Sequence, residues 1–142
     1  DKIVLDAKAK DKKELLSDLV DVLFKGSEAK NRKAFLKALL EREALGSTGI
    51  GYGVAIPHAK TDLVKNVNIA IARLRDEIDF QALDGAPVQL VFMIAAPSAQ
   101  VGIYLKILAE IAKLIQDRNF KTRIIAAKSA KEIIEIIKGC SK

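Results

Sequence analysis

The chain has 142 residues, half of them hydrophobic and 30% charged, with a formal net charge of +6 and no Trp. This balance is typical of one globular domain whose core is built mainly from aliphatic side chains. No apolar run approaches the ~20 residues that span a bilayer, and the first residues lack a cleavage-type site, so we expect neither direct membrane insertion nor a signal peptide.

The first half of the chain predicts one strand and two helices. Residues 2–6 are typical of a short strand. Asp11 is placed to cap a helix that Gly26 ends, and Asn31 is placed to cap a second helix that Gly46 ends.

The second half predicts two strands and three helices. Residues 67–74 alternate in part, as a strand does, and residues 83–87 form a turn. Residues 88–96 are almost continuously apolar, which suits a central strand covered on both faces. Helices are expected over 101–117, over 119–127 and over 129–139, the last capped by Ser129 and ended by Gly139.

Strands and helices therefore interleave along the chain. This order favours an α/β fold, with a mixed β-sheet flanked by helices on both faces and a single domain over residues 1–142.

Charge and cysteine content narrow the function classes. The basic residues, Lys12 among them, are scattered among acids, which favours a solvated surface over a nucleic-acid interface. The single cysteine, Cys140, cannot form an internal disulfide, so a reducing compartment such as the cytoplasm fits. One cysteine and one histidine are too few ligands for a zinc site, so no metal or cofactor is expected.

Residues 46–60, GSTGIGYGVAIPHAK, hold half of the eight glycines and the only histidine, His58. The glycine spacing lacks the strand–loop–helix context of a dinucleotide fingerprint, and no Gly-Lys-Ser/Thr ends it as in a Walker loop. Ser47 and Asp62 could complete a catalytic triad with His58, but no G-x-S-x-G turn is present. These observations disfavour nucleotide binding and Ser-based hydrolysis.

His58 could instead act by itself as a nucleophile. A neutral imidazole has a free lone pair near pH 7 and can accept a phosphoryl group. Backbone N–H groups of a glycine-rich loop can approach phosphate oxygens closely, and the hydroxyls of Ser47 and Thr48 and the N–H of Gly49 are suitable donors. The alternative is that the histidine is only structural.

Arg42 follows the apolar stripe Phe35–Ala38–Leu39 of its predicted helix, in the last turn before the glycines. A guanidinium on that stripe needs a partner. It could cap the helix-end carbonyls, or it could present its planar fork to a phosphate beside His58. Position alone leaves both open.

Residues 41–60, EREALGSTGIGYGVAIPHAK, closely resemble the signature R-E-x-x-G-S-T-G-I-G-x-G-x-A-I-P-H of enzyme IIA domains of the fructose/mannitol class of the bacterial phosphoenolpyruvate:sugar phosphotransferase system. The resemblance extends to LDGAPVQLVFMIAAP, residues 83–97, and to the helix that follows. It covers essentially the whole chain.

This resemblance implies a phosphocarrier that acts through a phosphohistidine intermediate. His58 would accept the phosphoryl group from the phosphocarrier HPr on Nε2, with Nδ1 held by a local acceptor, and would pass it to a cysteine of a IIB domain of a sugar permease. Arg42 matches the family's active-site arginine. The chain could also form a homodimer. Nucleic acid is not expected as a partner.

Tyr104 departs from the family pattern, because many members have a second histidine at this position. Tyr104 lies on the inward stripe of its predicted helix, so it either donates to the phosphate or is a core aromatic. The substitution is also compatible with a regulatory protein of the nitrogen-regulatory type. In such a protein, phosphorylation controls the binding of a partner and no sugar is taken up.

Overall fold

The computed structural model describes residues 2–140, and the prediction for the Cys140 thiol lies outside the described side chains. Within this range the chain forms a six-stranded sheet and five helices. The strands are β1 (Ile3–Ala7), β2 (Gly49–Gly51), β3 (Val54–Ala55), β4 (His58–Thr61), β5 (Asn68–Ile78) and β6 (Val88–Pro97). The helices are α1 (Lys12–Leu23), α2 (Ala29–Leu45), α3 (Val101–Ile115), α4 (Arg118–Ala126) and α5 (Ala130–Cys140).

The sheet is mixed and centred on β6. On one side β6 pairs antiparallel with β5, which pairs parallel with β1. On the other side β6 pairs parallel with two short strands in succession, β3 near its start and β4 near its end. β2 pairs antiparallel with β3 at the outer edge. The predicted mixed α/β architecture in one domain is therefore confirmed.

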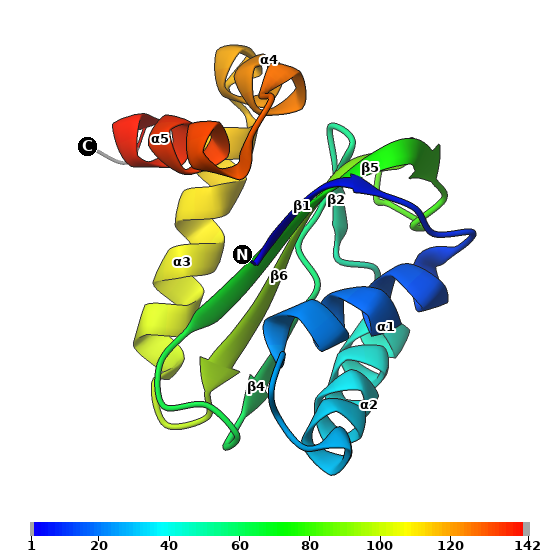
Figure 1. Ribbon diagram of the computed structural model, residues 1–142, viewed down its shortest axis with the longest axis vertical. Helices are drawn as coiled ribbons and strands as arrows, with labels where there is room; N and C mark the ends of the chain where they lie inside the picture. Colours follow the sequence, from blue (N-terminus) through cyan, green and yellow to red (C-terminus); the bar gives the residue numbers. More distant parts are fainter. Residues whose placement is uncertain (1, 141–142) are drawn as a thin grey trace.

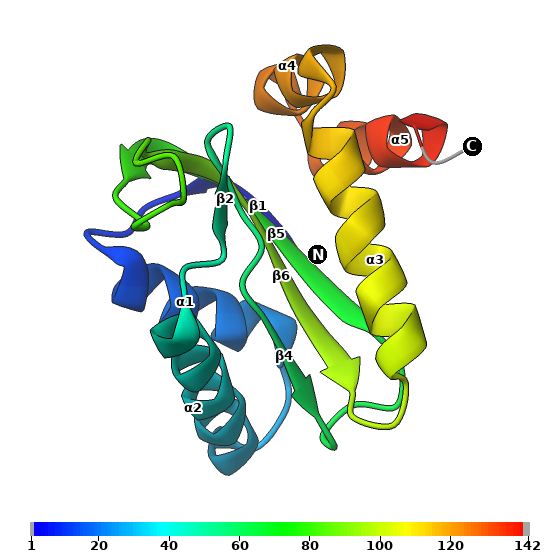
Figure 2. The same cartoon turned by 180° about the vertical axis from the view of Figure 1, so that it is seen from behind.

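Helices cover both faces of the sheet, with α1 and α2 on one side and α3, α4 and α5 on the other (Figures 1 and 2). β6 is buried almost throughout, and its alternation divides the core. Met93 belongs to the cluster that includes residues of α1 and α2, whereas Phe92 and Ile94 belong to the cluster that includes residues of α3, α4 and α5. Burial on both faces explains why this strand is continuously apolar.

Several predicted helix ends are confirmed by hydrogen bonds. The Asp11 carboxylate accepts from the N–H of Glu14 at 2.9 Å, and Ser129 Oγ accepts from the N–H of Glu132 at 3.1 Å. Both are side-chain caps that satisfy a free N–H of the first turn. α2 ends at Leu45, with Gly46 as its C-cap, as predicted.

Two predicted ends are wrong. α2 begins at Ala29, with Glu28 as its N-cap, so Asn31 lies inside the first turn and does not cap it. α5 continues to Cys140 through Gly139. Gly139 is exposed near the end of a strongly amphipathic helix, where the packing of the isoleucines outweighs the weak helix propensity of one glycine.

The glycine-rich stretch forms more regular structure than its composition indicates. It contains the β2–β3 hairpin, whose turn residues Tyr52 and Gly53 have φ of 60° and 77°. Two consecutive positive φ values are typical of a type I′ turn, in which glycine is favoured. The chain then crosses from β3 to β4 along the same edge of β6, which brings His58 opposite Ile94.

Candidate active site

His58 is the first residue of β4 and is partly buried. Its Nδ1 lies 2.6 Å from the main-chain oxygen of Ile56. Because a carbonyl oxygen only accepts, Nδ1 carries the proton and donates it, which leaves the lone pair of the neutral ring on Nε2. The fixed tautomer therefore makes Nε2 the nucleophilic nitrogen.

The surroundings keep this imidazole neutral. Burial lowers the pKa of His58 below its usual value of 6.5, and the nearby Arg42 guanidinium lowers this pKa further. The hydrogen bond to Ile56 and the charge of Glu43 act in the opposite direction, but the net shift of the pKa is downward. At pH 7 the ring is therefore in the form that can act as a nucleophile.

Arg42 lies in the last turn of α2, and its Nη1 donates to the carbonyl of Gly46 at 2.8 Å. This hydrogen bond is the helix-end cap considered from the sequence. Arg42 also lines two neighbouring hollows beside His58, each of about 390 Å³. A guanidinium has five N–H donors, so the bond to Gly46 leaves others for a phosphate.

Tyr104 extends from α3 toward the histidine. The ring centroids of Tyr104 and His58 are 5.5 Å apart, with an edge-to-face angle of 60°. The expectation that Tyr104 faces the site is confirmed, although the side chain is only 7% exposed and also belongs to the core cluster. Burial raises the pKa of Tyr104, so its hydroxyl keeps its proton at neutral pH and can donate.

The predicted phosphate donors Ser47, Thr48 and Gly49 are engaged within the protein. Ser47 Oγ accepts from the N–H of Gly49 at 3.0 Å and donates to the carbonyl of Phe80 at 2.7 Å. The N–H and the hydroxyl of Thr48 both donate to the Glu43 carboxylate. Ser47 and Thr48 line one of the hollows beside His58, and Gly49 is not among its lining residues.

Gly49 has a packing reason for being glycine. A Cβ at this position would lie 2.9 Å from the Cα of Ala82, which is closer than carbon atoms approach without a shift of the chain. Its part in a phosphate-binding loop stays a prediction.

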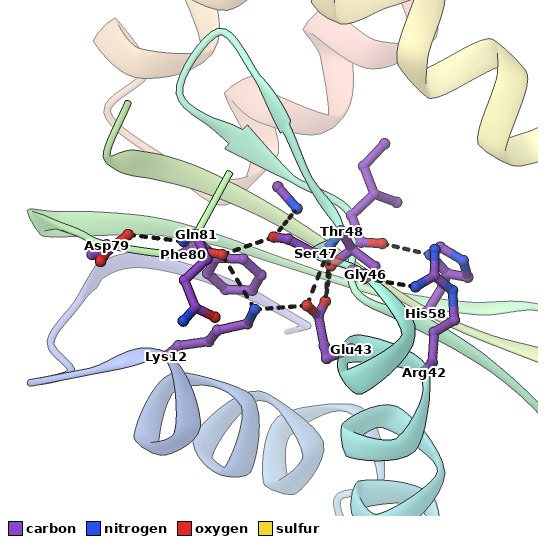
Figure 3. Close-up of polar contacts among 12 residues, drawn as sticks. Lys12, Arg42, Glu43, Gly46, Ser47, Thr48, His58, Asp79, Phe80 and Gln81 are labelled. Atoms are coloured by element: carbon purple, nitrogen blue, oxygen red, sulfur yellow. Dashed lines mark hydrogen bonds and ion pairs between the residues drawn. The ribbon is translucent and has the colours of Figure 1, made fainter. Parts of the chain in front are cut away.

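Two residues of the site were not found by sequence reasoning. Lys12, at the start of α1, forms an ion pair of 2.7 Å with Glu43, and the Glu43 side chain is only 6% exposed (Figure 3). The prediction that the lysines lie on outer faces is wrong for Lys12. A signal existed for Glu43, because it follows Arg42 in the signature, but a carboxylate amid the charged residues of a helix looks like part of a solvated face.

The mouth of the site is largely apolar. Leu45 is 86% exposed and lines one hollow, and Leu83 is 77% exposed and lines the other. Among the side chains that the structure describes, residues 2–139, no group of three or more His, Cys, Asp or Glu is placed to hold a metal ion. Over the same residues, no helix has the length and apolar character needed to cross a membrane.

A family model described as the EIIA 2 domain of the phosphoenolpyruvate-dependent sugar phosphotransferase system matches residues 1–140. The chain belongs to this family. The resemblance found in the glycine-rich signature is thereby confirmed, and the site around His58 lies in an EIIA domain.

Known relatives of this EIIA domain include both sugar-transport and regulatory proteins. It is 40% identical over 135 residues to the fructose-specific EIIABC component of Bacillus subtilis, covering 95% of this chain but 21% of that protein. It is 39% identical over 132 residues to a nitrogen regulatory protein of Bradyrhizobium diazoefficiens, covering 92% of this chain and 84% of the relative. Among solved structures, IIA-Ntr of Neisseria meningitidis superposes with a TM-score of 0.90 at 34% identity, covering 96% and 92% of the two chains.

Proposed function

We propose that this EIIA domain is a phosphocarrier that accepts a phosphoryl group on Nε2 of His58. The observation that carries the proposal is the hydrogen bond of Nδ1 to the Ile56 carbonyl, which leaves Nε2 as the free nucleophile of a neutral ring. The neighbouring Arg42 and the un-ionised Tyr104 supply donors for the phosphate oxygens.

In the transfer step, the Nε2 lone pair attacks phosphorus in line with the bond to the donor. The Nε2–P bond forms while the bond from phosphorus to the donor breaks, and the donor leaves with that electron pair. Throughout the step the proton stays on Nδ1 of His58, which continues to donate its hydrogen bond to the Ile56 carbonyl. The guanidinium of Arg42 stabilises the negative charge on the equatorial oxygens.

The donor in this proposal is phospho-HPr, and the acceptor is a cysteine thiolate of a IIB domain. The thiolate attacks the phosphorus of phosphohistidine, so that an S–P bond forms while the Nε2–P bond breaks and its electron pair returns to Nε2 of His58. The apolar mouth with Leu45 and Leu83 suits docking of protein partners over a small-molecule substrate. A IIA of the mannitol system of Escherichia coli, 23% identical and with a TM-score of 0.80, has been solved in complex with phosphorylated IIB, which supports a IIB partner.

A regulatory role of the nitrogen-regulatory type is the second candidate. It is supported by the 39% identity to the Bradyrhizobium nitrogen regulatory protein, which is close to the 40% identity to the Bacillus fructose component, and by the TM-score of 0.90 with IIA-Ntr of Neisseria meningitidis. The same phosphorylation of His58 would then control binding of another protein, and no sugar would be transported.

The experiment is to incubate the protein with phosphoenolpyruvate, enzyme I and HPr. We expect one acid-labile phosphoryl group per chain, and none on a His58→Ala variant, because this is the only histidine. Equal labelling of the His58→Ala variant would disprove the proposal.

The two roles are then separated by adding a fructose-type IIB domain to the purified phosphoprotein. Rapid loss of the label to IIB supports the sugar-transport role. A phosphoprotein that keeps its label supports the regulatory role.

A further inference from the structure

A continuous series of contacts runs from α1 to the catalytic ring. Lys12 Nζ pairs with Glu43, whose carboxylate accepts from both the N–H and the hydroxyl of Thr48. The carbonyl of Thr48 in turn accepts from the N–H of Ile56 at 2.9 Å. The carbonyl of that same Ile56 residue holds Nδ1 of His58.

The first members of this series are partly buried, and each makes more than one polar contact. The side chains of Lys12 and Glu43 are 18% and 6% exposed. Lys12 Nζ also donates to the carbonyl of Phe80 at 3.2 Å and lies 4.5 Å from the centre of its ring. Within the described residues, no buried side-chain nitrogen or oxygen is left without a partner. A pair held at this many points has little freedom to move.

Because Glu43 follows Arg42 in the chain, the Lys12–Glu43 ion pair also affects the position of Arg42. Glu43 precedes Gly46, whose carbonyl binds Arg42, by three residues. With Lys12 in place, the carboxylate is neutralised from the side of α1 and turns toward Thr48 (Figure 3). Without Lys12, the uncompensated Glu43 carboxylate would attract the guanidinium of Arg42, the preceding residue of the chain, away from the hollow beside His58.

We propose that Lys12 and Glu43 are positioning residues that hold the Thr48 and Ile56 main chain so that His58 presents Nε2 to the phosphoryl group. The relevance to transfer rests on the proposed function of His58. The Lys12–Glu43 pair touches neither the ring nor the phosphate, and it acts through the carbonyl that fixes the tautomer.

The tautomer can be measured without any phosphoryl donor. Because the chain has one histidine, the imidazole ¹⁵N signals of uniformly labelled protein come only from His58, and they are recorded at a pH where the ring is neutral. The wild type is expected to show a single Nδ1–H form. Lys12→Met should give a mixture of the two tautomers, since the Ile56 carbonyl is no longer held in place, whereas Lys12→Arg should keep the single form.

Transfer from phospho-HPr provides the second readout. Lys12→Met should lower the maximal rate by about 10- to 100-fold, the size of effect expected from misplacing a reacting group by ~1 Å. The HPr concentration at half-maximal rate should stay unchanged, because docking does not involve this pair. Lys37→Met is the matched control, since Lys37 forms an exposed 4.0 Å pair with Glu41 on the same helix as Glu43.

A double variant guards against misfolding of the single one. Lys12→Met leaves the Glu43 charge buried without its partner, whereas Lys12→Met combined with Glu43→Met replaces the pair by apolar side chains, an exchange that often preserves stability. The folded double variant should still show mixed tautomers and slow transfer.

Retention of the single Nδ1–H form and of the wild-type rate in a folded variant would overturn the inference. If the wild type accepts no phosphoryl group, the proposed function fails, while the tautomer measurement still decides on the positioning role.

Discussion

At the scale of single residues, the reactivity of this site depends on which nitrogen of His58 carries the proton. Ile56, two residues earlier, fixes the proton on Nδ1, and burial keeps the ring neutral. In the proposed function, the charge that stabilises the phosphate comes from a neighbour, Arg42, which lines the same hollow as His58. Nucleophile and positive charge are thus placed on different side chains.

Replacing Arg42 by lysine should slow phosphorylation by phospho-HPr about 100-fold, which corresponds to roughly 3 kcal/mol in the barrier. A lysine keeps the positive charge but loses the planar fork that can bind a phosphate through two N–H groups while a third holds Gly46. Rapid-quench measurement of the labelled protein gives the rate, and Arg75→Lys, at an exposed position, is the control. Unchanged transfer with a lowered melting temperature would mean that Arg42 only caps α2.

Tyr104→Phe should reduce the same rate only a few-fold. The phenol is a neutral donor, and one neutral hydrogen bond contributes about 0.5–1.5 kcal/mol, half or less of what a charged donor adds. The ring contact with His58 survives the substitution, so the fold should be unaffected.

Tyr104→His, assayed beside the Phe variant, should make the rate depend on pH between about 6 and 8, where a second imidazole titrates. A pH-independent rate in the His variant would indicate that position 104 does not reach the phosphoryl group.

At the scale of elements, one guanidinium adds polar contacts between the sheet and the end of α4. Arg73 in β5 donates through Nε to the carbonyl of Leu5 in β1 at 3.1 Å. Its Nη1 donates to the carbonyls of Ile124, Ile125 and Ala127, where α4 ends. A positive charge at a helix C-terminus also complements the helix dipole.

Arg73→Met should therefore lower the free energy of unfolding by about 2–4 kcal/mol, since it removes a charged donor from several partly buried carbonyls. Chemical denaturation measures the change. Arg75→Met, two residues further along β5 and exposed, should change stability by less than about 0.5 kcal/mol. Equal effects of the two substitutions would show that the contacts of Arg73 with α4 add nothing to stability.

At the scale of the whole molecule, the low pKa of His58 couples the site to the stability of the fold. In the unfolded chain the pKa of this residue returns to about 6.5, so below that pH the unfolded state binds more protons than the folded state. Stability should therefore fall as the pH drops from about 6.5 through the lowered pKa of the folded protein.

Melting temperatures of the wild type and of His58→Gln at pH 7.5 and pH 5.5 test this coupling. The wild type should lose more stability between the two pH values than the variant, which has no group titrating at this position. An equal loss of stability in both proteins would mean that the burial of neutral His58 does not destabilise the fold at low pH.

The sequence by itself indicated the five helices, three of the six strands in the described chain and the candidate reactive residue, His58. Helix caps such as Asp11 and Ser129, the apolar periodicity and the continuous apolar run of β6 are local patterns, because each depends on residues a few positions apart. The signature around His58 is also contiguous, and it was sufficient to indicate the family that the comparisons confirm.

Only the tertiary structure decided how the site is supported. Lys12 and Phe80 are 68 residues apart in the chain, and nothing in their spacing predicts that they meet beside Glu43. The contact of Tyr104 with His58 likewise depends on how α3 packs across the sheet. Such contacts are fixed by the packing of elements on the central strand. The lysine that looks solvated in the sequence becomes partly buried where α1 packs on α2. Local spacing selects the elements, whereas the burial and pairing of charges follow only from the way those elements pack.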